Sequence, residues 1–191
     1  MGVADNKSVT MLRRSRGLLL GALLCLPVGA ATLERLSLDD VITKSTAIVR
    51  GKILSSYSAF RGPMIYTYYR VQVLEQWKGA PALEVDVAVP GGKASGYEQV
   101  FSGAPALVAG SECVMFLWTG RAGLTQVIGL SQGLFDVKRT DRGDVVAVRP
   151  GTTELLLDPN TRQPVSDQAV ALRLVELKQR IVRTLAAGGS R

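Results

Sequence analysis

The feature that most constrains this chain is a long alternation of apolar and polar side chains between Ile65 and Trp77. Successive side chains of a β-strand point to opposite faces, so a period of two is typical of a strand half buried in a sheet. β-branched and aromatic residues, frequent here, favour such a pleated surface. One predicted face carries Ile65, Thr67, Tyr69, Val71 and Val73, and the other carries Tyr66, Tyr68, Arg70 and Gln72. The sequence therefore predicts a sheet-based fold.

Further short strands are predicted along the chain, separated by turn residues. Leu83 to Val89 alternates in the same way, with Leu83 expected to face inward, and Cys113 to Trp118 is a continuous apolar run typical of a central strand. A glycine at position 51 indicates a bulge in the first strand, and Arg61-Gly62-Pro63 indicates a turn. The remaining strands are expected at 47–54, 125–128, 134–137 and 145–148, with a hairpin turn at 141–144.

Two helices are predicted, one near each end of this sheet. Ser37 has the character of an N-cap for a short helix that ends at Lys44. The range 166–187 is predicted to be a long amphipathic helix that begins at Ser166 and is capped by Ser166-Asp167-Gln168. Its apolar stripe is formed by Val170, Leu174, Leu177, Ile181 and Leu185. The expected fold class is mainly β (α+β), a small β-barrel or curled antiparallel sheet with a short N-terminal helix and a long amphipathic C-terminal helix.

Residues 1–31 have the layout of a secretory signal peptide. Basic residues at 13–16 precede an apolar run, and small residues follow Pro27. The run is shorter than the roughly 20 apolar residues of a membrane-spanning helix. We expect cleavage after Ala30 or Ala31, export to the periplasm or the medium, and a single β-rich domain at 32–191 with no integral membrane span. Met11 is an alternative start, and Arg13-Arg14 leaves both the Sec and the twin-arginine route open.

Composition removes several classes of function. The chain has no histidine, which excludes Ser-His-Asp and Cys-His nucleophiles and histidine-ligated zinc. Beyond the leader, Cys113 is the only cysteine, so the domain is expected to fold without an internal disulfide and to bury this thiol as an inert core residue. The net charge is +7, but no Lys/Arg cluster indicates nucleic-acid binding. No metal or cofactor is expected.

A glycine-rich segment from Gly91 to Gly110 is the strongest candidate for a functional loop. Long irregular segments are unusual inside compact domains and often carry function. Lys93 and Ser95 beside the glycines lack the Lys-Ser/Thr pair of a phosphate-binding loop. The predicted contact surface therefore combines this loop with tyrosines of the neighbouring strand, and its candidate binding residues are Tyr66, Tyr68, Gly91, Gly92, Lys93 and Tyr97.

Carboxylates offer an alternative, because a pair of them can catalyse hydrolysis. The candidates are Asp39-Asp40, Glu84 with Asp86, and Asp158. Helix capping, a solvated strand face and a turn explain these three groups equally well. The basic C-terminal helix could likewise lie on an anionic membrane, although packing against the sheet is the commoner use of such a stripe.

Several segments resemble a recurrent layout in an uncharacterised family of exported bacterial proteins. They are 46–53, 68–79, 89–92, 110–117 and 129–135. The first two strands also resemble, more weakly, the netrin/metalloproteinase-inhibitor type of OB-like barrel. This resemblance implies an OB-like barrel that binds a ligand or inhibits a protease. The inhibitors use an N-terminal cysteine and a disulfide framework, which the expected mature chain lacks, so no inhibitory residue is carried over.

The predicted function is an exported, non-catalytic binding or interaction module whose partner is an envelope or extracellular protein. The alternatives are a carboxylate-based hydrolase and a periplasmic peptidase inhibitor. The ligand and the oligomeric state are left open.

Overall fold

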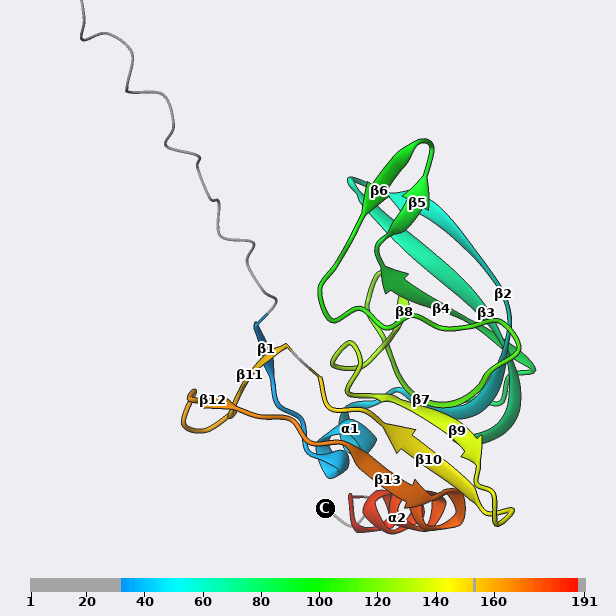
Figure 1. Ribbon diagram of the computed structural model, residues 1–191, viewed down its shortest axis with the longest axis vertical. Helices are drawn as coiled ribbons and strands as arrows, with labels where there is room; N and C mark the ends of the chain where they lie inside the picture. The colour runs from blue at the N-terminus through cyan, green and yellow to red at the C-terminus, as the bar shows by residue number, and fades with distance from the viewer. Residues whose placement is uncertain (1–31, 153, 189–191) are drawn as a thin grey trace, which may run out of the picture.

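The computed structural model describes residues 32–152 and 154–188 (Figure 1). The predicted signal peptide, residues 1–31, lies outside these ranges. Within them, no helix is both long enough and apolar enough to cross a membrane.

The fold is mainly β, with antiparallel sheets and one helix toward each end. In chain order the elements are β1 (Thr32–Glu34), α1 (Leu38–Lys44), β2 (Ala47–Arg61), β3 (Met64–Lys78), β4 (Glu84–Pro90), β5 (Gly92–Ala94), β6 (Tyr97–Gln99), β7 (Glu112–Thr119), β8 (Thr125–Val127), β9 (Leu134–Arg139), β10 (Val145–Arg149), β11 (Leu155–Leu157), β12 (Pro164–Val165), β13 (Val170–Arg173) and α2 (Leu174–Gly188). Every strand that the alternation predicted is present.

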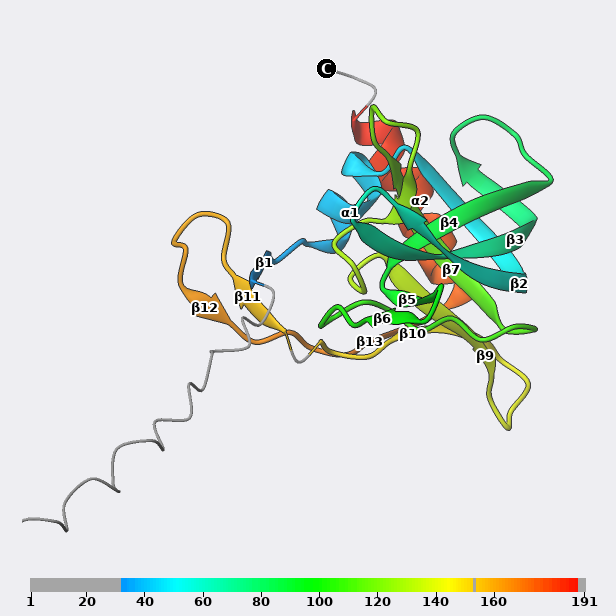
Figure 2. The ribbon, with the colours of Figure 1, turned by 90° about the horizontal axis from the view of Figure 1, so that it is seen from above.

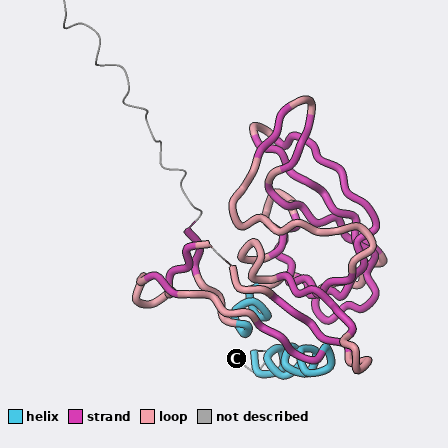
Figure 3. Tube along the Cα trace, in the orientation of Figure 1, coloured by secondary structure: helices cyan, strands magenta, loops and turns pink. Residues whose placement is uncertain are grey.

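The main sheet has eight strands in the order β13-β10-β9-β7-β2-β3-β4, with β8 also paired to β7. All of its pairings are antiparallel. The sheet curls until β4 comes close to β8, but these two strands do not pair, so the barrel is not closed (Figures 1 and 3). The predicted curled antiparallel sheet is thus confirmed.

Strand β7 separates two apolar cores, because its side chains alternate between them. Cys113, Met115 and Leu117 enter the core inside the curl. Val114 and Phe116 enter a second core between the outer face of the sheet and the two helices. All five are at most 1% exposed, which explains why this strand is apolar at every position rather than at alternate ones.

The long hairpin β2–β3 forms the back of the curl. Its register shifts between Arg50 and Gly51, which confirms the predicted bulge. A side chain at position 51 would place its Cβ 2.8 Å from the Gln72 carbonyl oxygen, so only glycine fits here. Leu83, expected to face inward, instead precedes β4 and is 87% exposed, although its carbonyl accepts from the Val73 backbone N–H of β3 at 2.8 Å.

Helix α1 begins as predicted. The Ser37 hydroxyl accepts from the Asp40 backbone N–H at 3.1 Å, and the Asp40 carboxylate accepts from the Ser37 backbone N–H, which completes a capping box. Helix α2 buries Leu177 and Ile181 against the second core.

The predicted start of α2 at Ser166 is wrong, because the helix begins at Leu174. Residues 170–173 pair with β10 as strand β13, and the backbone N–H of Arg173 donates to Glu176 at the helix start. Asp167 does not cap a helix: its carboxylate accepts from Arg149 at 2.8 and 3.0 Å and from the Thr152 backbone N–H at 3.0 Å. The apolar residues of β13 continue the spacing of those in α2, so the sequence pattern predicted a single helix over both elements.

A separate three-stranded sheet, β1-β11-β12, stands beside the main body (Figure 2). Its strands β1 and β11 run parallel, with Leu33 opposite Leu156. The three strands of this sheet are short and far apart in the sequence, so the alternation of apolar and polar residues did not predict them.

Candidate contact face

Three tyrosines gather on the outer side of the β2–β3 hairpin, away from the core inside the curl. Tyr57 of β2 lies directly opposite Tyr68 of β3. Tyr66 lies two residues before Tyr68 in the same strand and therefore points to the same side. The rings of Tyr57 and Tyr68 are stacked, with centroids 5.2 Å apart and planes at 17°. The Tyr66 ring lies 6.3 Å from that of Tyr68. We call Tyr57, Tyr66 and Tyr68 the tyrosine face.

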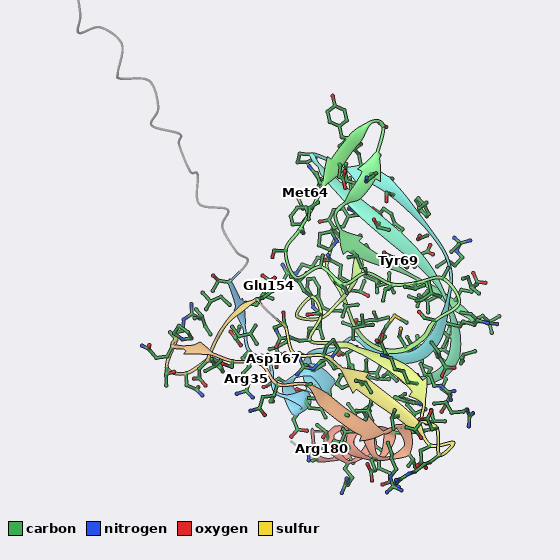
Figure 4. All side chains as sticks on the ribbon, in the orientation of Figure 1. Arg35, Met64, Tyr69, Glu154, Asp167 and Arg180 are labelled. Carbon is green, nitrogen blue, oxygen red and sulfur yellow. The ribbon has the colours of Figure 1, made fainter. Side chains whose placement is uncertain are left out.

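The alternation of β3 places the rings of Tyr66 and Tyr68 outward, and Tyr57 of β2 lies opposite Tyr68. Tyr69, on the opposite side of the strand, is buried in the core inside the curl (Figure 4), and Val71 belongs to the same core. Ala88 of β4 pairs with Tyr68 and is 2% exposed, so β4 continues the apolar floor of the face. Tyr57 remains 57% exposed, which makes its ring the most accessible of the three.

A polar band borders the tyrosine face one pair further along β3 and β4. Arg70 lies opposite Asp86 and donates to its carboxylate at 3.1 and 3.4 Å. Glu84 approaches the same guanidinium at 3.8 Å. The hydrogen bond to Asp86 raises the pKa of Arg70, and the charges of Asp86 and Glu84 act in the same direction. We call Arg70, Glu84 and Asp86 the polar band.

The phenol hydroxyls of the tyrosine face remain available to a partner. Among the hydrogen bonds of the described residues, none uses the hydroxyl of Tyr57, Tyr66 or Tyr68. Each hydroxyl can both donate and accept. The face therefore offers aromatic surface and free hydrogen-bonding groups side by side, in rings held in place by stacking.

The structure separates the other predicted contact residues from these tyrosines. Tyr97 lies on β6 and meets the ring of Phe60, with centroids 6.0 Å apart, and Phe60 pairs with the buried Ile65. It thus belongs to the inner side of the hairpin. Lys93 forms an ion pair with Glu98 at 3.1 Å across the β5–β6 hairpin.

Gly91 and Gly92 have a role in the path of the backbone. Both have positive φ angles, 100° and 131°. A Cβ on Gly92 would lie 2.5 Å from the Ser58 hydroxyl oxygen, and the Gly91 carbonyl accepts from the Thr67 hydroxyl at 2.8 Å. These glycines let the chain cross closely over the inner side of β2 and β3. The segment predicted to be an irregular loop therefore begins with an anchored hairpin.

Tyr57 is the member of the tyrosine face that the sequence did not predict. The first strand was predicted to end at residue 54, whereas β2 continues to Arg61. The sequence did contain a signal for this longer strand. A hairpin turn at 61–63 indicates that the residues before the turn pair with the alternating strand after it. Extending the first strand back from that turn places Tyr57 opposite Tyr68.

The carboxylates considered for hydrolysis do not converge. Asp39 of α1 accepts from Arg180 at 2.9 Å and from Thr184 at 2.8 Å, which docks the two helices. Asp158 accepts from the backbone N–H groups of Asn160 and Thr161 in the turn before β12, both at 2.9 Å. Glu84 and Asp86 lie on β4. These groups belong to three separate parts of the fold, and each has a structural partner.

The remaining reactive groups are the thiol of Cys113 and the acidic side chains. Cys113 is 1% exposed, which confirms its predicted burial, and this burial raises the pKa of its thiol to about 11. In the described part of the chain, no three Cys, Asp or Glu side chains are placed to hold a metal ion.

The basic residues of α2 are largely tied to the protein itself. Lys178 contacts Glu75 at 2.5 Å and lies 5.7 Å from the centre of the Trp77 ring. Glu75 also accepts from Arg50 at 2.7 Å. These contacts lower the pKa of Glu75 to about 2, with the Lys178 hydrogen bond as the main cause. The packing role predicted for α2 is confirmed.

No protein-family model, no curated protein and no solved structure matches this chain.

Proposed function

We propose that residues 32–191 form an exported, non-catalytic binding module and that the tyrosine face is its contact surface. The observation that carries this proposal is the set of three tyrosine rings fixed on one solvent-facing side of a rigid hairpin. Tyrosine supplies a large amphipathic contact area at low conformational cost and is enriched in binding surfaces. The stacking of Tyr57 on Tyr68 lowers that cost further, because the rings are ordered before a partner arrives.

The export part of the proposal rests on the sequence of residues 1–31. Cleavage after Ala30 or Ala31 removes no described residue, since β1 begins at Thr32. The mature chain then meets its partner in the periplasm or outside the cell.

The resemblance to OB-like barrels supports binding rather than catalysis, because such barrels present strand faces to their ligands. The tyrosine face lies on strands of this kind, β2 and β3. Peptidase inhibition has less support, since the proposed mature chain lacks the cysteine framework of the inhibitors it resembles.

The test uses the chain expressed with its own leader. Mass spectrometry of the exported protein is expected to find Ala31 or Thr32 at its N-terminus. A product that retains residues 13–31 would contradict export with cleavage.

Binding is tested by crosslinking the exported protein in the intact envelope. The paired change Tyr57→Ala and Tyr68→Ala is compared with Tyr97→Ala, a tyrosine on the inner side of the hairpin that is 68% exposed against 57% for Tyr57. Thermal unfolding establishes that both variants fold. We expect the paired change to abolish the crosslinked species and Tyr97→Ala to preserve them. Equal crosslinking by both variants would place the contact surface elsewhere.

A further inference from the structure

The polar band beside the tyrosine face has hydrogen-bonding capacity that the fold leaves unused. A guanidinium carries five N–H donors in a plane, and Arg70 directs two nitrogens at Asp86. An ionised carboxylate has about four lone-pair sites, and Asp86 accepts from Arg70 alone among the hydrogen bonds of the described residues. The side chains of Arg70 and Asp86 are 52% and 46% exposed, so these free sites are open to a ligand.

The charges on this side of the sheet balance. Lys52, Gln72 and Glu84 lie in one row across β2, β3 and β4, and Arg70 and Asp86 lie in the next. Each row thus contains one cation and one anion. A surface of this kind does not select a highly charged partner by complementary charge.

The shape of the surface favours a long ligand over a small one. Pockets for small molecules enclose most of the ligand surface. The tyrosine face instead lies on an open strand surface, where Tyr57 is 57% exposed and the polar band is about half exposed. A ligand that lies across several side chains can reach both the rings and the polar band.

We infer that the tyrosine face and the polar band together bind an uncharged polysaccharide chain. This inference rests on the proposed function and names its ligand class. Sugar rings present C–H faces that pack on aromatic rings, and hydroxyls that pair with planar guanidinium, carboxylate and phenol groups. A protein partner would instead have to cover the Arg70–Asp86 ion pair and remove its water, which is costly unless every polar group is satisfied again. Sugar hydroxyls supply those hydrogen bonds themselves.

The experiment is native electrophoresis of the exported chain in gels containing laminarin, hydroxyethyl cellulose or dextran as uncharged polymers. Polygalacturonate serves as the anionic comparison. The variants are the pair Tyr57→Ala with Tyr68→Ala, the pair Tyr57→Phe with Tyr68→Phe, and Arg70→Lys, with Tyr97→Ala as the control. Thermal unfolding of each variant shows that it is folded.

The unmodified chain is expected to be retarded by at least one uncharged polymer, with little dependence on salt. Loss of the two rings is expected to weaken this binding by about tenfold or more, as for a central aromatic contact. The phenylalanine pair and Arg70→Lys are expected to weaken it less, since each removes hydrogen bonds but leaves the rings. Tyr97→Ala is expected to match the unmodified chain.

Three results would overturn the inference. Equal retardation of all variants would place the polymer elsewhere, and retardation by polygalacturonate alone would show charge selection. No retardation, together with a crosslinked envelope protein that depends on Tyr57 and Tyr68, would exclude the polysaccharide and keep the proposed binding function. If crosslinking were independent of these tyrosines as well, both proposals would fail.

Discussion

Removal of the Asp167 carboxylate should destabilise the fold strongly, because it would leave the Arg149 guanidinium buried without its counter-ion. The side chain of Arg149 is 11% exposed and that of Asp167 is 4% exposed, and two hydrogen bonds of 2.8 and 3.0 Å join them. Breaking a buried pair by removing one partner costs about 3–5 kcal/mol. Asp167→Ala also leaves the Thr152 backbone N–H without its acceptor. We therefore expect a loss of about 3–5 kcal/mol.

Urea unfolding followed by fluorescence measures this loss through the shift of the midpoint at constant slope. The matched controls are Arg149→Met and the double variant Arg149→Met with Asp167→Leu. Apolar residues of similar volume can replace a buried pair with little loss, so the double variant is expected to be more stable than either single variant. The cycle then gives a coupling energy between the two positions.

The same measurement distinguishes a buried ion pair at Asp167 from the helix start predicted at Ser166. A side chain that only capped a helix would contribute about 1 kcal/mol and would show no coupling to Arg149. A loss of this small size from Asp167→Ala, with additive single variants, would refute the assignment of a buried ion pair.

Three further predictions concern the helix, the hairpin and the thiol. The pKa of Glu75 lies near 2 in the folded chain against 4.5 for the free group, so its stabilising contribution is present above pH 4.5 and declines as the pH falls toward 2. Glu75→Gln should therefore flatten this part of the acid unfolding curve. An unchanged curve would contradict the contacts assigned to Glu75. Gly92→Ala, at φ 131° and against Ser58, should lower the free energy of unfolding by roughly 1–3 kcal/mol in urea, whereas Gly96→Ala, with no heavy atom within 4 Å of its Cβ, should cost less; equal losses would argue against the close approach. Cys113, with a pKa near 11, should react with a thiol reagent at pH 8 only as fast as the protein unfolds, and rapid labelling of the folded chain would show that the thiol is accessible.

The elements that alternation predicts are those with a strong local signal. The inward and outward faces of β3 follow from period two, and buried Val71 with outward Tyr68 confirm them. Ser37 and Asp40 predict the start of α1 because capping depends only on neighbouring residues. Cys113 was predicted to be buried because apolar residues surround it in the sequence.

The errors arise where distant segments decide the structure. Residues 170–173 have helical spacing relative to Leu177, but pairing with β10 makes them a strand. Asp167 resembles a cap until Arg149 is known to lie beside it. The arrangement of the tyrosines was half predicted for the same reason. Tyr66 and Tyr68 belong to a strong local pattern, whereas the place of Tyr57 depends on the length of a neighbouring strand and that of Tyr97 on how the β5–β6 hairpin folds back.

Because β7 contributes to both cores, the two halves of the domain cannot melt independently. A large change at Phe116 should also loosen the curl, since the backbone that holds Met115 moves with it. Amide hydrogen exchange should accordingly report one cooperative opening for β2, β7 and α2, with similar protection in all three. The β2–β3 hairpin, which bears the tyrosines, is thus held in place by β7, the strand that also packs against the helices.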